Sequence, residues 1–318
     1  MIRRALFWGL GGLFFSLLLL PALLVRGCLP RRPEGRGPEV ALYQVGSGRL
    51  LRLGLEDYLV GVIAAEVPAR FHLEALKAQA VAARTMAVHR MKRFGGRGCR
   101  HCPSADLCDR PEDGQAWLSE EELRRRWGWR YPWFRARIER AVRETRGLVL
   151  LYGRRPIEAV YHSTCGGRTE DAAAVWGRAV PYLKSVPCGY DGASPRLRSE
   201  VRIDWREAAR RLGLAGKAAG PPGDLAVLAR TTSGRVARLR IWGRVLTGPA
   251  ARSAFGLRST DFSARIEGER LVFTVRGNGH GVGLCQYGAE GMAGRGADFR
   301  QILFHYYPGT RLGRLGSD

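Results

Sequence analysis

Two amphipathic helices dominate the pattern of apolar and polar positions in the first third of the chain. The stretch Leu55–Val67 has a helical period, and its apolar residues share one face until Pro68 ends the helix. A second helix is predicted over Leu73–Arg93, with an apolar stripe of aliphatic residues. Each stripe carries one charged residue at its centre, Glu66 in the first helix and Arg84 in the second.

These two central charges need an explanation, because buried Glu and Arg side chains are rare unless they are paired or line a cleft. Two interpretations are open. In one, Glu66 and Arg84 form an ion pair that only fixes helix packing. In the other, Glu66 is a carboxylic acid in a partly apolar cleft, where desolvation raises its pKa and a nearby cation lowers it.

Shorter elements follow along the chain. Ser119 and Glu122 form a capping box that starts one helix, and Pro132 opens the next. Alternating residues around Gly153–Arg155 predict a β-hairpin. Further strands are predicted at Val40–Val45, Val236–Trp242 and Ala264–Gly277, the last of which is broken by a turn at Glu267–Gly268. Further helices are predicted at Trp205–Leu212 and Phe299–His305. The pattern predicts an α+β fold, a two-lobed domain with a helical part, a β-rich part from about Leu148, and a cleft between them.

An apolar segment without charges, Ala5–Val25, follows Arg3 and Arg4 at the N-terminus. It is long enough to cross the ~30 Å hydrocarbon core of a bilayer as a helix, and its positive end should stay in the cytoplasm. A cleaved signal peptide is the competing interpretation, although the segment is long and Arg26–Cys28 is a poor cleavage site. We therefore expect a single transmembrane helix in the cell membrane, with the rest of the chain extracytoplasmic.

The segment after the anchor sets the expected domain boundaries. Residues 1–28 form the cytoplasmic end and the anchor, and residues 29–38, rich in Pro, Arg and Gly, form a linker. Residues 39–312 form one domain, interrupted by a Cys- and Gly-rich insertion at residues 95–117.

The chain is strongly basic for its 318 residues. Lys and Arg number 52 against 29 Asp and Glu, which gives a formal charge of +23. Such a charge suits a polyanionic partner: nucleic acid, an anionic membrane surface or a cell-wall polymer. The alternative is an Arg-rich proteome, and no nucleic-acid-binding motif accompanies the charge.

Seven cysteines raise the question of a metal or a disulfide. Four soft ligands within ten residues suit structural zinc; they are Cys99, His101, Cys102 and Cys108. A disulfide within this segment and free thiols are the alternatives. Elsewhere Cys165 and Cys188 could pair, whereas Cys285 suits a packed small residue.

A glycine-dense loop, Gly277–Gly283, superficially suggests phosphate binding. It lacks the strand and helix context and the Lys-Ser/Thr pair of a P-loop, so we interpret it as a tight backbone segment. His280 in this loop is either a structural residue or a residue close to the catalytic group.

Six segments together resemble the stage II sporulation protein D family, the peptidoglycan lytic transglycosylases of endospore-forming bacteria. They occur in the order of the family and span nearly the whole region after the anchor. The segments are LEDYLVGVIAAEVP (Leu55–Pro68), LEALKAQAVAARTMA (Leu73–Ala87), VYHSTCGG (Val160–Gly167), VPYLKSV (Val180–Val186), GNGHGVGLCQYGAEGMA (Gly277–Ala293) and ILFHYYPGT (Ile302–Thr310).

The resemblance implies that glycan strands already stripped of stem peptides are cleaved to 1,6-anhydro-muramic products during engulfment. It implies that Glu66 is the catalytic acid and that Arg84, Tyr182 and Lys184 bind substrate. No cofactor is required for this chemistry. Some clostridial members hold a zinc ion near the Cys-rich insertion, but two of their ligand positions are lost here, where Asp113 and Gly114 stand before Gln115.

The resemblance also implies partners: glycan strands, the sporulation amidase (stage II protein P) and a polytopic membrane protein (stage II protein M). Two rival functions remain. One is a non-catalytic wall-binding protein that activates an amidase. The other is a zinc hydrolase centred on the Cys-rich insertion, which a closed set of thiolates disfavours.

Overall fold

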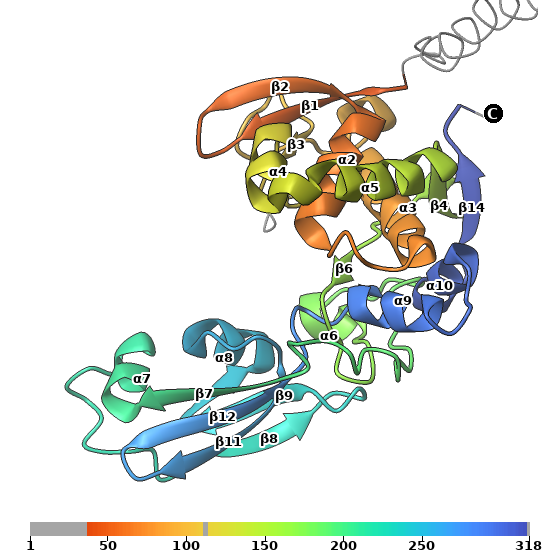
Figure 1. Ribbon diagram of the computed structural model, residues 1–318. Helices are drawn as coiled ribbons and strands as arrows, with labels where there is room; N and C mark the ends of the chain where they lie inside the picture. The colour runs from red at the N-terminus through yellow and green to blue at the C-terminus, as the bar shows by residue number, and fades with distance from the viewer. Residues whose placement is uncertain (1–36, 111–113, 317–318) are drawn as a thin grey trace, which may run out of the picture. The chain divides into compact units, whose positions relative to one another are not determined.

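The structure of the protein is a computed structural model that describes residues 37–110 and 114–316 (Figure 1). The chain divides into two units after Pro38, and nearly all described residues belong to the second unit, Glu39–Asp318. Helices and mixed sheets make up this second unit, so the predicted α+β class is seen in it.

The predicted anchor at Ala5–Val25 lies outside the described residues. Within 37–110 and 114–316, no helix combines the length and the apolar character needed to cross a bilayer. We correct the predicted fold class and localisation accordingly. The described chain is α+β, and its helices give no support for a single-pass membrane protein.

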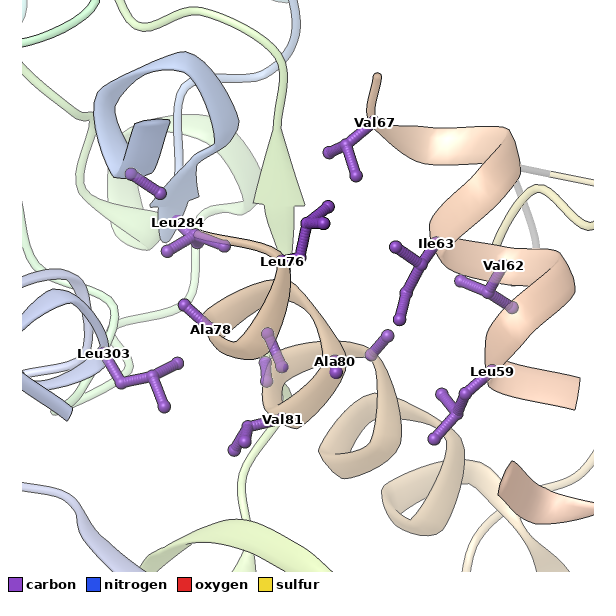
Figure 2. Packing of buried hydrophobic residues seen from close by; sticks show 14 of the residues in the cluster. Leu59, Val62, Ile63, Val67, Leu76, Ala78, Ala80, Val81, Leu284 and Leu303 are labelled. Atoms are coloured by element: carbon purple, nitrogen blue, oxygen red, sulfur yellow. The ribbon is translucent and has the colours of Figure 1, made fainter. Parts of the chain in front are cut away.

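The larger hydrophobic core is centred on the two helices that the apolar pattern predicts. These are α2 (Leu55–Glu66) and α3 (Leu73–Arg90). Figure 2 shows Ile63 of α2 directed towards Leu76 and Ala80 of α3, and all three are fully buried. Burial of this shared aliphatic face is the main stabilisation of the pair, because isolated helices of this length are marginal in water.

Helix α3 is buried on all sides rather than along one stripe. Every residue from Ala78 to Val88 is buried, and the many alanines let neighbouring elements approach closely. The predicted stripe was too narrow because several further elements contact α3, and four of them make the most extensive contacts. They are α5 (Tyr131–Glu144), α9 (Gln286–Ala293), α10 (Phe299–Tyr306) and β4 (Leu148–Tyr152). The helix ends at Arg90, before the 3₁₀ turn η1 (Lys92–Phe94).

Local signals place the next helices correctly. The capping box is present at the start of α4 (Glu120–Trp127), where the Ser119 hydroxyl accepts from the Glu122 N–H and the Glu122 carboxylate accepts from the Ser119 N–H. The 3₁₀ turn η2 (Gly128–Arg130) then leads into α5, which has Pro132 in its first turn.

Three small sheets border the larger core. In the first, β1 (Glu39–Gln44) lies between β2 (Arg49–Gly54) and β3 (Leu107–Cys108); in the second, β4 lies between β14 (Arg311–Arg314) and β5 (Arg155–Pro156). In the third, β6 (Tyr161–His162) pairs in parallel with β13 (Leu284–Cys285). The predicted hairpin around Gly153–Arg155 is confirmed as β4–β5, but its second strand is shorter than predicted.

A second hydrophobic core lies between Ile203 and Val275 in the sequence, and the larger core resumes at Val282. The predicted turn at Glu267–Gly268 is confirmed, since it joins two antiparallel strands there. The elements of this region are β7 (Arg198–Asp204), α7 (Trp205–Arg211), β8 (Ala226–Arg230), β9 (Val236–Ile241), β10 (Arg244–Thr247), α8 (Gly248–Phe255), β11 (Asp261–Glu267) and β12 (Arg270–Arg276). A short helix, α6 (Ala172–Trp176), precedes it.

Candidate functional site

Glu66 is the last residue of α2, where the backbone turns into an extended conformation at Val67 before Pro68. Its side chain is half-buried. Oε1 accepts a hydrogen bond of 3.0 Å from the Ala116 N–H, and Oε2 lies 3.5 Å from the Gln286 side-chain amide, which donates to it. Three segments far apart in the sequence therefore meet at this carboxyl group.

Burial raises the pKa of Glu66 above its ordinary value of 4.5, and the hydrogen bonds from Ala116 and Gln286 lower it only in part. A carboxyl group in this environment holds its proton closer to neutral pH than an exposed one does. It keeps enough hydrogen bonding to stabilise the carboxylate that remains after the proton has left. These are the properties of a general acid that becomes a base.

A buried hydrogen-bond network lies beside Glu66. The Tyr161 hydroxyl donates to Oε1 of Gln115 over 2.8 Å, and the Gln115 amide donates to the Tyr58 hydroxyl over 3.2 Å. Gln115 is only 2% exposed, and it directly precedes the residue whose N–H binds Glu66. The network thus fixes the backbone that orients the carboxyl group.

Arg84 is fully buried and does not pair with Glu66. It binds Glu56 in the first turn of α2 through two hydrogen bonds, Nη2–Oε2 at 2.6 Å and Nε–Oε1 at 3.0 Å. Its remaining hydrogen bonds go to acceptors of α3, α5 and the start of β4; these are the carbonyls of Ala80, Val142 and Leu148 and the hydroxyl of Thr145. The ion-pair interpretation was right about a pair and wrong about the partner.

Tyr182 and Lys184 lie in a different neighbourhood. The Tyr182 ring is half-buried, 5.5 Å from that of Tyr152, and its hydroxyl accepts from the Glu158 N–H. It lines a pocket of about 540 Å³ with His89. Lys184 is exposed, with Nζ 3.4 Å from a carboxylate oxygen of Asp171.

A larger pocket of about 820 Å³ shares His89 with the first, and it is basic. The cationic residues in its lining are Arg90, Arg97, Arg100 and Arg178. Among the hydrogen bonds of the described residues, none joins Glu66, Arg84, Tyr182 and Lys184 to one another.

Five other carboxylates are available in the sequence as a second acid, and most of them already have partners; they are Glu56, Asp57, Glu158, Glu170 and Asp171. Four of the five have partners, namely Glu56 with Arg84, Glu158 with Arg178, Glu170 with Thr231 and Ser233, and Asp171 with Lys184. The fifth, Asp57, is exposed in the first turn of α2. None of these side chains hydrogen-bonds to Glu66 in the described residues.

His280 sits in the glycine-dense loop as a neutral, satisfied ring. Nε2 lies 3.0 Å from the Tyr161 carbonyl and must donate to it, while Nδ1 accepts from the Val282 N–H. Burial lowers the pKa of His280 to about 4. At Gly283, where φ is 71°, a Cβ would meet the Val160 carbonyl, so the loop is tight for reasons of backbone packing.

The four predicted ligands of the Cys-rich insertion do not all lie within 4.8 Å of one another in the described residues, although Cys102 packs against the cluster that contains Cys99 and Cys108. Cys99 and Cys108 are buried with Ala105 in a small apolar cluster, and the Cys102 sulfur lies 3.1 Å from the Ser104 hydroxyl. Among the described residues, the group of potential ligands whose atoms all lie within 4.8 Å of one another is a different one: Cys165, Cys188, Asp191 and Cys285. All six described cysteines are free thiols, so neither predicted disulfide is present.

Sequence reasoning missed Gln286 and Ala116 as neighbours of Glu66. Both lie in segments noted for other reasons, Gln286 directly after Cys285 and Ala116 in the Gln115–Trp117 run. No periodicity signal joins residues 50 and 220 positions away from Glu66, because only the tertiary fold brings them there.

Comparison with known proteins decides the family. A family model described as Stage II sporulation protein matches residues 44–152, which include Glu66 and Arg84. The stage II sporulation protein D of Bacillus subtilis (strain 168) is 35% identical over 320 residues, covering 93% of this chain and 92% of the relative. The chain belongs to the stage II sporulation protein D family.

Two further relatives are similar to this chain, and one of them carries the same family name. The protein of the same name from Bacillus amyloliquefaciens is also 35% identical, over 97% of this chain and 95% of its own length. The amidase enhancer of Bacillus subtilis is 28% identical over 80% of this chain, but only 40% of that protein is covered. The resemblance inferred from the six sequence segments is therefore confirmed, and the chain is a member of a sporulation family.

Proposed function

We propose that this protein is a lytic transglycosylase that cleaves the glycan strands of peptidoglycan during sporulation, with Glu66 as general acid and then base. The observation that carries the proposal is the environment of the Glu66 carboxyl group. It is half-buried, its pKa is raised by desolvation, and it is oriented by hydrogen bonds from Ala116 and Gln286.

The proposed reaction needs one carboxyl group. Protonated Glu66 donates to the glycosidic oxygen between muramic acid and glucosamine, and positive charge develops at C1 of the muramic acid. The C1–O bond breaks, the 6-hydroxyl oxygen of the same sugar bonds to C1, and the Glu66 carboxylate takes the hydroxyl proton. The products are a 1,6-anhydro end and a free 4-hydroxyl. A hydrolase would need a second carboxylate to activate water.

Substrate contacts are proposed for the accessible cations and the neighbouring tyrosine. Lys184 and Tyr182 are exposed or half-buried, and the basic pocket beside Tyr182 suits the carboxylates of muramic acid. Arg84 is fully buried against Glu56. We therefore propose that Arg84 fixes the position of α2, the helix that ends at Glu66, and does not contact the sugar.

A second candidate function is activation of a sporulation amidase without cleavage of glycan by this chain. The similarity to an amidase enhancer favours it. Under either function the partners are glycan strands and a wall amidase.

The deciding experiment analyses by mass spectrometry the products that the purified full-length chain makes from denuded glycan strands. Anhydro ends that disappear in Glu66→Gln, with a loss of about 10²-fold or more, support the proposal. Reducing ends would show a hydrolase instead. Intact strands, with faster peptide release when an amidase is added, would support the activator.

A further inference from the structure

The buried group Cys165, Cys188, Asp191 and Cys285 is unlike the rest of the core. These side chains are at most 3% exposed, and their ligand atoms all lie within 4.8 Å of one another. Three thiols and a carboxyl group at one point of an apolar interior are costly unless something compensates them. None of the functions considered so far uses them.

We propose that these four side chains bind one zinc ion as a closed structural site. Four ligands at zinc–sulfur and zinc–oxygen distances of about 2.3 and 2.0 Å stand about 3.5–3.8 Å from one another in a tetrahedron. The observed group fits this size. Three soft sulfurs select zinc over the hard cations Mg²⁺ and Ca²⁺, which prefer oxygen ligands.

The surroundings of the sulfurs suit thiolates. The Cys285 sulfur accepts from the backbone N–H groups of Cys165 and Gly288, each over 3.3 Å, and the Cys188 sulfur lies 3.0 Å from the Tyr306 hydroxyl. Such donors orient ligands and delocalise their charge in thiolate metal sites.

The carboxyl group of Asp191 is held as firmly as the sulfurs. Its Oδ2 accepts from the Gly166 N–H at 2.7 Å and lies 3.2 Å from the sulfur of Cys165. The backbone of α9 packs tightly against the site, since a Cβ at Gly288 would meet the Cys188 sulfur and the Tyr306 hydroxyl. The four ligands leave no open coordination position for substrate, so the metal would be structural.

The site would join chain segments on either side of the second hydrophobic core. Cys165, Cys188 and Asp191 precede that core in the sequence, and Cys285 follows it. A metal bound to all four closes a loop of 120 residues between Cys165 and Cys285. Such a link stabilises the folded state through its binding free energy, because the unfolded chain lacks a preformed site.

The same link reaches the neighbourhood of Glu66. Cys285 caps the N-terminus of α9, and the next residue is Gln286, whose amide donates to Glu66. A metal on Cys285 would therefore hold Gln286 in place. The metal assignment itself does not depend on the proposed activity.

Elemental analysis of the full-length chain, purified without added metal or chelator, tests the assignment. We expect about one zinc ion per chain and its loss in Cys188→Ser and Cys285→Ser, since a serine hydroxyl does not replace a thiolate. Asp191→Asn should weaken zinc retention against a competing chelator. The matched control is Cys102→Ser, which alters a thiol of the other cysteine group and should retain the zinc.

Measurements on the unsubstituted chain guard against variants that fail to fold. A chelator should lower its Tm, and replacement by Co²⁺ should give the visible absorption of a tetrahedral thiolate site. Chain without zinc, with Cys165 and Cys188 joined as a disulfide by mass spectrometry, would overturn the proposal. So would zinc that survives Cys285→Ser and is lost in Cys102→Ser.

Discussion

Arg84 and Glu56 form a two-pronged ion pair that joins α3 to the first turn of α2. The guanidinium is 0% exposed, and both of its hydrogen bonds to the carboxylate are 3.0 Å or shorter. Glu66 lies ten residues further along α2, about 15 Å away at the rise of an α-helix. One helix therefore carries a structural carboxylate at its start and the proposed catalytic carboxyl group at its end.

Removing Glu56 should destabilise the protein strongly. Glu56→Gln leaves the buried Arg84 without its counter-charge, and breaking a buried pair in this way costs about 3–5 kcal/mol. Urea denaturation at neutral pH measures the change in the free energy of unfolding. Glu120→Gln is the control, because its pair with Arg124 is more than half exposed and solvent screening leaves it little effect on the free energy of unfolding. Equal effects in the two variants would contradict the structural role of Arg84.

Glu66→Gln should not share this destabilisation. Because burial raises the pKa of Glu66, the folded state favours the protonated form, and that stabilisation is lost as the pH rises from 4.5 through the raised pKa. Above this window the ionised group is a cost that the Gln variant lacks. We expect the variant to match or exceed the wild type in unfolding free energy at pH 7 and to lose this advantage at pH 4.

Glu290→Gln is the matched control for the loss of glycan cleavage expected in Glu66→Gln. Glu290 is also half-buried with a raised pKa, but its carboxylate accepts from the His72 N–H, and no hydrogen bond among the described residues joins it to Glu66. Cleavage of glycan should survive in Glu290→Gln. Loss of cleavage in both variants would point to a general effect on folding.

Gln286→Leu should change the pH dependence of cleavage as well as its rate. The Gln286 amide lowers the pKa of Glu66, so its removal should raise that pKa further and move the alkaline limb of the pH–rate profile to higher pH. A merely structural role would lower the rate at every pH without moving the limb. The profile on denuded glycan strands, with Tm as a check on folding, separates the two.

His280→Gln should reduce the loss of stability in acid. Burial lowers the pKa of His280 from 6.5 to about 4, so the neutral ring contributes stability above pH 6.5 that is lost as the pH falls towards 4. The variant has no group to protonate there. Denaturation at pH 7 and pH 4.5 should show a smaller difference for the variant than for the wild type. An unchanged difference would exclude His280 as a source of the acid sensitivity.

Local sequence patterns were enough to predict the helix starts and turns that depend on interactions between residues close in the sequence. The capping box at Ser119, the helix start at Pro132 and the turn at Glu267–Gly268 all form as predicted. In each case the hydrogen bonds or dihedral preferences involve residues a few positions apart. The same locality explains why the pattern could single out Glu66 and Arg84 as charges on apolar faces.

The family could also be predicted from the sequence, because six short segments occur in the family's order along the chain. The contacts between these segments could not be predicted from the sequence. The role of Tyr182 and Lys184 towards a substrate stays a prediction.

Only the tertiary structure decided which groups meet. A helical wheel gives the face of a residue but not which residue of a neighbouring helix lies at the same height, so it placed Glu66 at the centre of the apolar face without showing that Arg84 pairs with Glu56. The cysteine spacing favoured Cys99–Cys108 because those residues are near in sequence. The buried group instead draws Cys165 and Cys285 together across 120 residues. Neighbours of this kind are set by the packing of whole elements, which depends on the summed burial of many side chains.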